Sequence, residues 1–348
     1  MSEPARILIV SPNWLGDAVM ALPAMADIRR HFARARLIIA ARRQVASLFR
    51  FVPGVDEVVE LGWHGALLRT RARGDDLTRL RTAAPDVAIL FPNSFATAWL
   101  VKRAAVPGRW GYATDLRRAL LTRAVPTATG SLHQGEYYQQ LVRGLGIATG
   151  PLEPVLAVPE AARDAARHLL AARGWDGARP IAVVAPGAAY GTAKRWLPAH
   201  FAQLSTRLID DRRAHVVLVG SATDRETCAT VAGAMAEAAI PFAANVAGET
   251  TLELLAGILG LASICISNDS GTMHLAAAAA VPVAAVFGPT RERETAPLPA
   301  PGGRTRVLIN PVWCRPCMLR ECPIDHRCMT GLMPNQVADA VGQLMGAA

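Results

Sequence analysis

The residues best suited to bind a phosphate lie in one turn, SNDSGTMH at positions 267–274. An apolar run precedes this turn, and an alanine-rich helical pattern follows it. Gly271 permits a tight turn, and Asp269 or Ser270 could cap the helix. Backbone N–H groups and the dipole at a helix N-terminus attract anions. We therefore predict a phosphate-binding turn of Asp269, Ser270, Gly271, Thr272 and His274, with a core position as the alternative for His274.

A second candidate lies in the segment APGAAYGTAKRWLP at positions 185–198. Small residues let the backbone approach a ligand closely, Thr192 offers a hydroxyl group, and Lys194 offers a compact positive charge. The chain otherwise uses arginine, because Lys102 and Lys194 are its only lysines. An ammonium group here favours anion binding over the alternative of a solvated basic loop.

The loop SPNWLGD at positions 11–17 brings an aspartate to the start of a predicted helix. The G-x-G-x-x-G pattern of dinucleotide-binding domains is absent from this loop, which argues against a nicotinamide-dependent oxidoreductase. The chain also lacks the P-loop pattern G-x-x-x-x-G-K-[ST]. Asp17 could cap the helix, or it could act as a general base at the edge of a sheet.

Asp224 follows another apolar run, in GSATD at positions 220–224. An acidic residue after the second strand of a nucleotide-binding domain can bind ribose hydroxyl groups. Alternatively, Asp224 and Glu226 cap the next helix. The residues alone do not separate these two interpretations.

Four of the six cysteines form a cluster with His326 among them: Cys314, Cys317, Cys322 and Cys328. In a cytosolic protein this spacing indicates a structural zinc site more than disulfides. Reduced thiols that pack a loop are the alternative. Cys228 and Cys265 have the pattern of small buried apolar residues.

Buried strands must position these residues. Apolar runs predict strands at 6–10, 37–41, 55–60, 86–91, 180–185, 215–219, 263–267 and 281–287, with a helix at 18–31. Helical patterns between the runs indicate parallel sheets covered on both faces. A proline-rich segment at 148–160 separates the halves. We predict an α/β protein with two doubly wound, Rossmann-like domains, 1–155 and 156–348, that face each other across a cleft.

The excess positive charge lies in one half of the chain. Residues 1–150 contain 20 basic and 11 acidic side chains, whereas residues 151–348 contain 17 of each. A basic surface concentrates anionic partners, and the low aromatic content of 5% argues against nucleic acid. No apolar stretch approaches the roughly 20 residues of a membrane span, and no secretory signal is visible. We therefore expect a cytoplasmic protein.

Three segments together resemble glycosyltransferase family 9, the ADP-heptose:lipopolysaccharide heptosyltransferases: ILIVSPNWLGDAVMALPA at 7–24, APGAAYGTAKRWLP at 185–198 and SNDSGTMHLAAAAAVPVAAVFGPT at 267–290. The SPNWLGD form and the cysteine run are most similar to the type II enzymes. The resemblance spans nearly the whole chain and implies a GT-B fold. Residues 1–155 would bind the acceptor, and residues 156–348, with the cysteine-rich C-terminal segment, would bind the nucleotide sugar.

The resemblance also implies roles for individual residues. It makes Asp17 the catalytic base and makes Lys194, with Thr192 nearby, a contact to the donor phosphates. The turn at 269–274 becomes the donor-binding turn. Asp224 is the candidate for the ribose contact, and Thr250 is the candidate for a position beside the adenine.

The implied reaction transfers L-glycero-D-manno-heptose from ADP-heptose to heptosyl-Kdo2-lipid A, with inversion. It needs no cofactor, and the absence of a D-x-D pair in the second half fits a metal-independent enzyme. Any zinc would be structural, because four thiolates leave no open coordination position. The acceptor is an anionic lipid at the inner membrane face, so peripheral attachment there is an option. A type I or III heptosyltransferase and a non-catalytic nucleotide-sugar binding protein are the alternatives.

Overall fold

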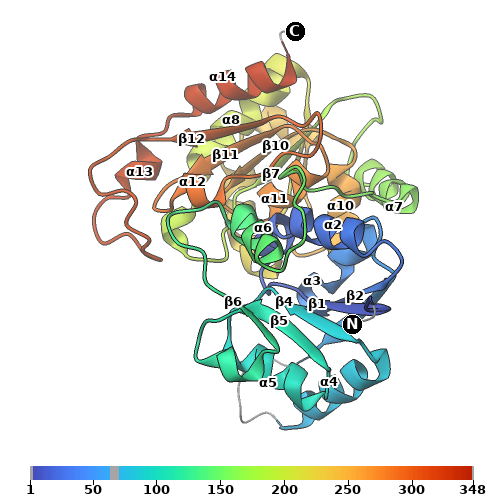
Figure 1. Ribbon diagram of the computed structural model, residues 1–348. Coiled ribbons are helices and arrows are strands. Elements are labelled where there is room, and N and C mark those ends of the chain that lie inside the picture. The colour runs from blue at the N-terminus through green and yellow to red at the C-terminus, as the bar shows by residue number, and fades with distance from the viewer. Residues whose placement is uncertain (1–2, 63–69, 347–348) are drawn as a thin grey trace. The chain divides into compact units, whose positions relative to one another are not determined.

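The computed structural model describes residues 3–62 and 70–346 (Figure 1). The chain divides into two compact units, Met1–Ala157 and Val158–Ala348, which we call unit 1 and unit 2.

Unit 1 is built on a six-stranded parallel sheet with the order β3-β2-β1-β4-β5-β6. Its strands are β1 (Arg6–Val10), β2 (Arg36–Arg42), β3 (Glu57–Leu61), β4 (Val87–Leu90), β5 (Gly108–Tyr112) and β6 (Arg123–Val125). Strand β1 lies between β2 and β4, and its residues Ile7, Leu8 and Ile9 are fully buried. A continuous apolar strand of this kind is typical of a parallel sheet that is covered on both faces.

Helices supply that cover: α1 (Leu15–Met20), α2 (Leu22–His31), α3 (Arg43–Ala46), α4 (Thr70–Ala83), α5 (Phe95–Arg103) and α6 (Gln134–Gly144). Helices α2 and α6 lie on one face of the sheet, and α4 and α5 lie on the other (Figure 1). Leu8 and Val10 belong to the apolar cluster that also contains Leu80 of α4 and Leu100 of α5.

The helix expected at residues 18–31 is two helices, α1 and α2, that meet at Ala21. Pro23 lies in the first turn of α2, where a helix does not need its missing N–H group. In the interior of one long helix, the same proline would remove a hydrogen bond and clash with the preceding turn. The proline therefore divides the predicted helix.

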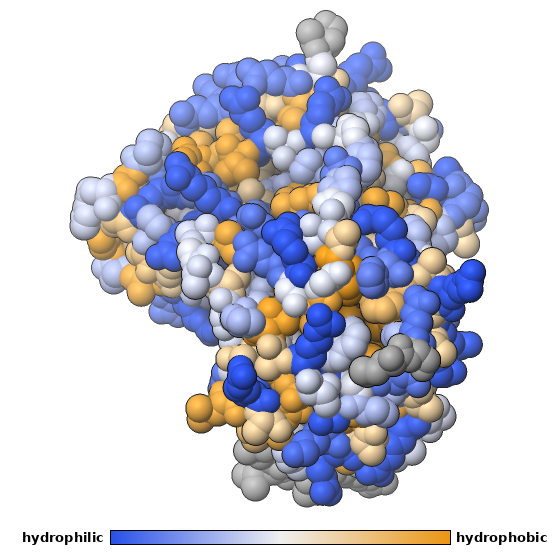
Figure 2. Space-filling view, in the orientation of Figure 1, coloured by the Kyte–Doolittle hydropathy of each residue, from blue (hydrophilic) through white to orange (hydrophobic). Residues whose placement is uncertain are grey.

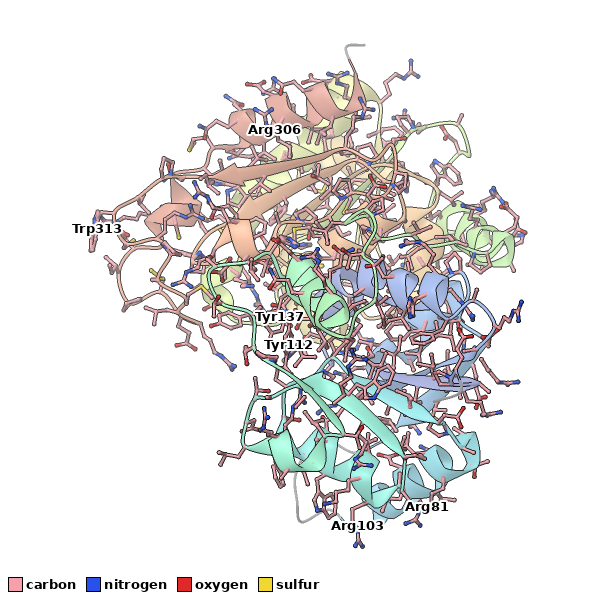
Figure 3. All side chains as sticks on the ribbon, viewed as in Figure 1. Arg81, Arg103, Tyr112, Tyr137, Arg306 and Trp313 are labelled. Atoms are coloured by element: carbon pink, nitrogen blue, oxygen red, sulfur yellow. The ribbon has the colours of Figure 1, made fainter. Side chains whose placement is uncertain are left out.

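Tyrosines attach α6 to the sheet of unit 1. The Tyr112 hydroxyl, at the end of β5, donates to the carbonyl oxygen of Tyr137 at 2.7 Å, and the two ring centroids are 4.6 Å apart (Figure 3). Tyr138 stacks on Phe91, just after β4, with 5.2 Å between centroids. These contacts hold α6 at the carboxyl ends of β4 and β5.

Unit 2 contains a second six-stranded parallel sheet, with the order β12-β11-β10-β7-β8-β9. Its strands are β7 (Ile181–Ala185), β8 (His215–Leu218), β9 (Ala243–Asn245), β10 (Ala262–Asn268), β11 (Val283–Phe287) and β12 (Thr305–Ile309). The patterns in the sequence do not predict β5, β6, β9 or β12. The two doubly wound sheets themselves agree with the predicted α/β class.

The helices of unit 2 are α7 (Glu160–Ala171), α8 (Pro198–Arg212), α9 (Arg225–Gly233), α10 (Leu252–Leu259), α11 (Gly271–Ala278), α12 (Glu292–Thr295), α13 (Arg327–Thr330) and α14 (Pro334–Met345). A buried cluster that includes Trp196, Phe201 and Met329 packs with the apolar side chains of α8 and α14. The Trp196 indole nitrogen donates to the Leu332 carbonyl oxygen at 2.9 Å. The C-terminal part of the chain is therefore built into the core of this unit.

The surface mixes hydrophilic and apolar residues, and the apolar residues on the face in view form small groups (Figure 2). Trp313 is 77% exposed and lies at the outer edge of unit 2 (Figure 3). Across residues 3–62 and 70–346, the helices are all too short or too polar to span a bilayer.

Candidate functional site

The loop after β1 carries Asp17. Helix α1 begins at Leu15, with Trp14 in the N-cap position, so Asp17 lies in the first helical turn rather than at the N-cap. The capping interpretation of Asp17 is therefore wrong in its detail. A carboxylate in the first turn of a helix is still stabilised by the positive end of the helix dipole. Its side chain is half-buried at the carboxyl edge of the sheet, where a ligand of a doubly wound domain binds.

Tyr138 of α6 is a neighbour of Asp17. Burial raises the pKa of the Tyr138 hydroxyl, and the negative charge of Asp17 raises that pKa further. Tyr138 is only 4% exposed and so stays neutral at physiological pH. The pair thus combines a carboxylate with a neutral hydroxyl group.

The loop after β4 meets the same edge of the sheet and is held by Arg117. This guanidinium is fully buried and donates to the carbonyl oxygens of Tyr112 (2.9 Å) and Pro92. Burial lowers the pKa of Arg117 to about 10, although Tyr137 and Asp115 oppose the shift. Arg117 was not a predicted site residue, because no local pattern shows that its guanidinium reaches the Pro92 carbonyl oxygen, 25 residues earlier in the chain.

A small cavity of about 50 Å³ lies at the carboxyl ends of β1 and β2. Its polar lining comes from the two loops, the end of β2 and the first turn of α5: Ser11, Asn13, Arg42, Ser94 and Thr97. Burial lowers the pKa of Arg42. Sequence reasoning missed this cavity, because its lining comes from segments that are distant in the sequence.

In unit 2, the structure brings Lys194 and Asp269 into direct contact. The Lys194 Nζ atom lies 2.6 Å from Asp269 Oδ2, and their side chains are 13% and 5% exposed. The Thr290 hydroxyl, after β11, donates to the same carboxylate oxygen at 2.7 Å. Lys194 also lies 4.9 Å from the ring centroid of Tyr190. Three separate loops at the carboxyl edge of the sheet therefore meet at the ion pair of Lys194 and Asp269.

Asn268 connects two of these loops. Its Oδ1 atom accepts from the Trp196 N–H at 3.0 Å, and its Nδ2 atom donates to the Pro186 carbonyl oxygen at 2.7 Å. The side chain is fully buried and spans both ends of the loop that carries Lys194. Sequence reasoning placed Asn268 in the turn but did not select it.

The turn at 267–274 has the expected form, but its capping differs from the prediction. Ser270 is the N-cap residue of α11, yet its hydroxyl group pairs with the Ser267 hydroxyl at 3.0 Å and does not cap the helix. Asp269 turns to Lys194 instead. Gly271 and Thr272 are half-buried at the first turn of α11, and the His274 side chain in the same helix is 4% exposed.

Asp224 and Thr250 lie on the loops after β8 and β9. Asp224 Oδ2 accepts from the Ser221 N–H (3.0 Å) and hydroxyl (2.6 Å), which forms a capping box. Asp224 Oδ1 lies 3.8 Å from Arg195. This capping box closes the short 3-10 turn Ala222–Asp224; Asp224 is also the N-cap residue of α9, but its side chain makes no capping bond to that helix, so the capping interpretation is correct in position and wrong in its contacts. Thr250 is half-buried and precedes Thr251, whose side chain caps α10. Thr192 is exposed, two residues before Lys194.

The clustered cysteines do not form a metal site in the described parts of the chain, where no three His, Cys, Asp or Glu side chains gather to hold an ion. The zinc site therefore stays a prediction without structural support. Burial raises the pKa of Cys328, and the thiols of Cys314, Cys322 and Cys317 add to the rise. Burial also raises the pKa of Cys228 and Cys265 to about 12, as expected for thiols that act as apolar residues.

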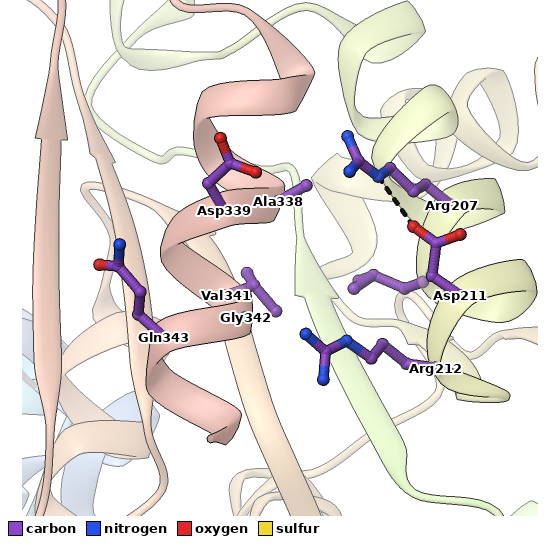
Figure 4. Close-up of a pocket in the computed structure, with 9 residues that line it drawn as sticks. Arg207, Asp211, Arg212, Ala338, Asp339, Val341, Gly342 and Gln343 are labelled. Atoms are coloured by element: carbon purple, nitrogen blue, oxygen red, sulfur yellow. Dashed lines mark hydrogen bonds and ion pairs between the residues drawn. The ribbon is translucent and has the colours of Figure 1, made fainter. Parts of the chain in front are cut away.

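A surface hollow of about 540 Å³ lies between α8 and α14 (Figure 4). An ion pair of 2.9 Å between Arg207 and Asp211 lies on its α8 side. These residues end α8 immediately before β8, so the hollow is at the amino edge of the sheet. It is therefore separate from the loops that hold Lys194 and Asp269.

Comparison with known proteins gives a consistent result. A model of glycosyltransferase family 9 (heptosyltransferase) matches residues 77–327. Lipopolysaccharide heptosyltransferase 2 of Escherichia coli (strain K12) is 30% identical over 304 residues, which cover 84% of this chain and 85% of that protein. The protein of the same name from Salmonella typhimurium is 31% identical over 301 residues, with the same two coverages.

A solved structure, the ADP-heptose lps heptosyltransferase II of E. coli, superposes on this chain with a TM-score of 0.83. The match covers 98% of both chains at 27% sequence identity. The GT-B prediction is confirmed.

Proposed function

Because the chain belongs to glycosyltransferase family 9, the heptosyltransferases, we propose that it transfers L-glycero-D-manno-heptose from ADP-heptose to heptosyl-Kdo2-lipid A. The observation that carries this choice is the similarity, over 84% of the chain, to relatives named lipopolysaccharide heptosyltransferase 2. The superposed E. coli protein, an ADP-heptose lps heptosyltransferase, supports the same donor.

On the donor side, Lys194 and the first turn of α11 bind the diphosphate. An ammonium group has three N–H donors, and Asp269 accepts from one of them. The other two are available to phosphate oxygens. Asp269 would repel a phosphate, so its function is to hold Lys194 in place. The backbone N–H groups at Gly271 and Thr272 add the donors and the dipole of a helix N-terminus.

Asp224 and Thr250 are our proposed contacts for the nucleoside end of the donor. The capping bonds of Asp224 use Oδ2, and Oδ1, which lies 3.8 Å from Arg195, is our proposed acceptor for a ribose hydroxyl group. Thr251 rather than Thr250 caps α10, so the Thr250 hydroxyl is not needed for capping. Thr192 and His274 complete the proposed donor contacts.

On the acceptor side, Asp17 is the general base. It accepts the proton of the acceptor hydroxyl group as that oxygen attacks the anomeric carbon of the heptose. The bond from the anomeric carbon to the phosphate oxygen breaks, and its electron pair leaves with ADP. Attack opposite to the leaving group inverts the configuration. Lys194 and the N–H groups of α11 stabilise the charge that grows on ADP, so the proposed step requires no metal ion.

The charge distribution supports an anionic acceptor. The whole formal excess of positive charge lies in residues 1–150, and Arg42 lines the cavity beside the Asp17 loop. Basic residues attract phosphorylated lipids at an anionic membrane surface. We propose that unit 1 binds the lipid A-core acceptor and that the enzyme attaches peripherally to the inner face of the cytoplasmic membrane.

The test is transfer to two matched acceptors. Purified protein with ADP-heptose should add one heptose to heptosyl-Kdo2-lipid A, as measured by mass spectrometry, and should release one ADP for each transfer. Kdo2-lipid A should remain unmodified, and a chelator should not change the rate. Transfer to Kdo2-lipid A alone would indicate a type I enzyme. Donor binding without transfer to either acceptor would indicate a binding protein.

A further inference from the structure

The cysteine-rich segment, residues 314–328, holds the residue that precedes Lys194. The Ala193 N–H donates to the Arg320 carbonyl oxygen at 2.9 Å. The Ala193 carbonyl oxygen pairs with His326 Nε2 at 2.7 Å. A carbonyl oxygen only accepts hydrogen bonds, so His326 Nε2 carries the proton. Both backbone polar groups of Ala193 are therefore fixed by the cysteine-rich segment.

Two more residues of the Lys194 loop contact this segment. The Tyr190 hydroxyl donates to the Met318 carbonyl oxygen at 2.8 Å, and the centroid of the Tyr190 ring is 4.9 Å from Lys194 Nζ and 5.3 Å from Arg320 Cζ. A Cβ atom on Gly191 would lie 2.2 Å from the Arg320 carbonyl oxygen. Only glycine permits so close an approach of the two backbones.

The other end of the segment fixes the loop that carries Thr290. Arg315 donates to the carbonyl oxygens of Gly288 (2.9 Å) and Thr290 (3.2 Å) and pairs with Glu292 at 2.9 Å. The Met318 N–H donates to the Pro289 carbonyl oxygen at 3.0 Å. Since Thr290 bonds to Asp269, and Asp269 bonds to Lys194, the segment closes a ring of contacts around the ammonium group.

His326 is itself held firmly in this ring. Its backbone is in the left-handed region, with φ of 59°. The backbone N–H of His326 donates to Cys322 Sγ at 3.3 Å, and its backbone carbonyl oxygen accepts from the backbone N–H of Met329 at 2.8 Å. These bonds set the direction of the imidazole ring toward Ala193.

We propose that His326 is a positioning residue of the donor site: through Ala193 it fixes the direction in which Lys194 presents its ammonium group to the donor phosphates. This proposal rests on the proposed function in one point only, which is that Lys194 contacts the donor phosphates. The cysteine-rich segment thereby becomes a structural part of the donor site.

The first test measures ADP binding by titration calorimetry. His326→Ala leaves the buried Ala193 carbonyl without its donor and should weaken ADP binding about tenfold. His326→Gln retains a side-chain N–H and should recover most of the affinity. The matched control is His168→Ala, which removes an exposed histidine of unit 2 on α7 and should bind ADP as the wild type does.

Steady-state assays separate a positioning role of His326 from a merely structural one. A positioning role predicts that His326→Ala raises the KM for ADP-heptose and leaves the KM for the acceptor unchanged. Unchanged ADP affinity in His326→Ala, or no recovery in His326→Gln, would overturn the proposal. Failure of the wild type to bind ADP would instead remove the proposed donor site itself.

A milder variant covers the case in which His326→Ala does not fold. Tyr190→Phe keeps the ring beside Lys194 and deletes only the bond to Met318. We expect a two- to fivefold loss of ADP affinity, which is about the value of one hydrogen bond. Wild-type affinity in this variant would show that the contacts with the cysteine-rich segment do not position Lys194.

Discussion

The two units have the same topology and different chemistry. Counted from the first strand of each unit, both sheets have the order 3-2-1-4-5-6. In such a sheet the chain runs in opposite directions away from the first and fourth strands, and ligands bind at the carboxyl ends near that point. Asp17 follows the first strand of unit 1, whereas Lys194 and Asp269 follow the first and fourth strands of unit 2.

The difference lies in what the loops hold at that point. In unit 1, a half-buried carboxylate lies near the neutral Tyr138 in the half of the chain that is otherwise basic. In unit 2, the partly exposed ammonium group of Lys194 is fixed by Asp269, which Thr290 holds in turn, in the half without net charge. The topology thus determines where a ligand binds, and the loops determine whether a base or a cation meets it.

Removal of the carboxylate from unit 1 should have the largest effect. Asp17→Asn should lower the transfer rate about 10³-fold, because a general base contributes on the order of 10²- to 10⁴-fold. ADP binding, which we assign to unit 2, should not change. Asp75→Asn, an exposed substitution of the same kind on α4, is the control and should transfer normally. Substantial turnover in Asp17→Asn, or loss of ADP binding, would break the division of roles.

Removal of the Lys194 ammonium group from unit 2 should have the next largest effect. Lys194→Ala should weaken ADP binding on the order of 10- to 100-fold, because hydrogen bonds to a charged group contribute about 1.5–3 kcal/mol. The chain supplies its own control, since Lys102→Ala removes the only other lysine. Titration of both variants with ADP separates the loss of a direct phosphate contact from the effect of a lower net charge on ADP affinity. Equal affinity in the two variants would contradict the assignment of Lys194.

The smallest predicted effect is on the free energy of unfolding, and it arises at the amino edges of the two sheets. The second strand of unit 1 begins with Arg36, paired with Glu57 at 3.0 Å, whereas the second strand of unit 2 begins with the fully buried His215. Within the described parts of the chain, neither ring nitrogen of His215 has a hydrogen-bond partner. Burial lowers its pKa from 6.5.

Below pH 6.5 the unfolded chain therefore takes up a proton at His215 that the folded chain resists. The free energy of unfolding should fall with decreasing pH, by at most about 1.4 kcal/mol per pH unit for this proton. His215→Leu should make the dependence weaker between pH 6.5 and 5 in urea denaturation. An unchanged slope in the variant would show that His215 does not contribute.

The central strands were predictable and several outer strands were not. The runs around Ile9 and Val183 are apolar throughout because helices cover both faces of a parallel sheet. Strands β6 and β9 have three residues each, and β5 contains Gly108 and Gly111. A Cβ atom on Gly108 would lie 2.8 Å from the Val87 side chain, so packing selects a residue that the strand pattern disfavours.

The positions of the site residues were more predictable than their contacts. Strand ends placed Lys194 and Asp269 at one edge of a sheet, but no local pattern shows that the two side chains form an ion pair. Thr290 and His326 reach the site through loops that are distant in sequence. His326 was counted with the cysteines, which drew attention to metal binding rather than to hydrogen bonding.

Gly191 and Arg320 approach each other closely, and this contact restricts substitutions at position 191 more than substitutions in the cysteine-rich segment. The cysteine-rich segment offers the carbonyl oxygens of Met318 and Arg320, which most side chains at those positions would leave in place; proline and β-branched residues at 318 are the exceptions, because Met318 has φ of 57° and its N–H donates to Pro289. Gly191 has no such freedom, because even one methyl group would overlap a backbone oxygen. A saturation library should therefore tolerate many residues at 318 and 320 and very few at 191.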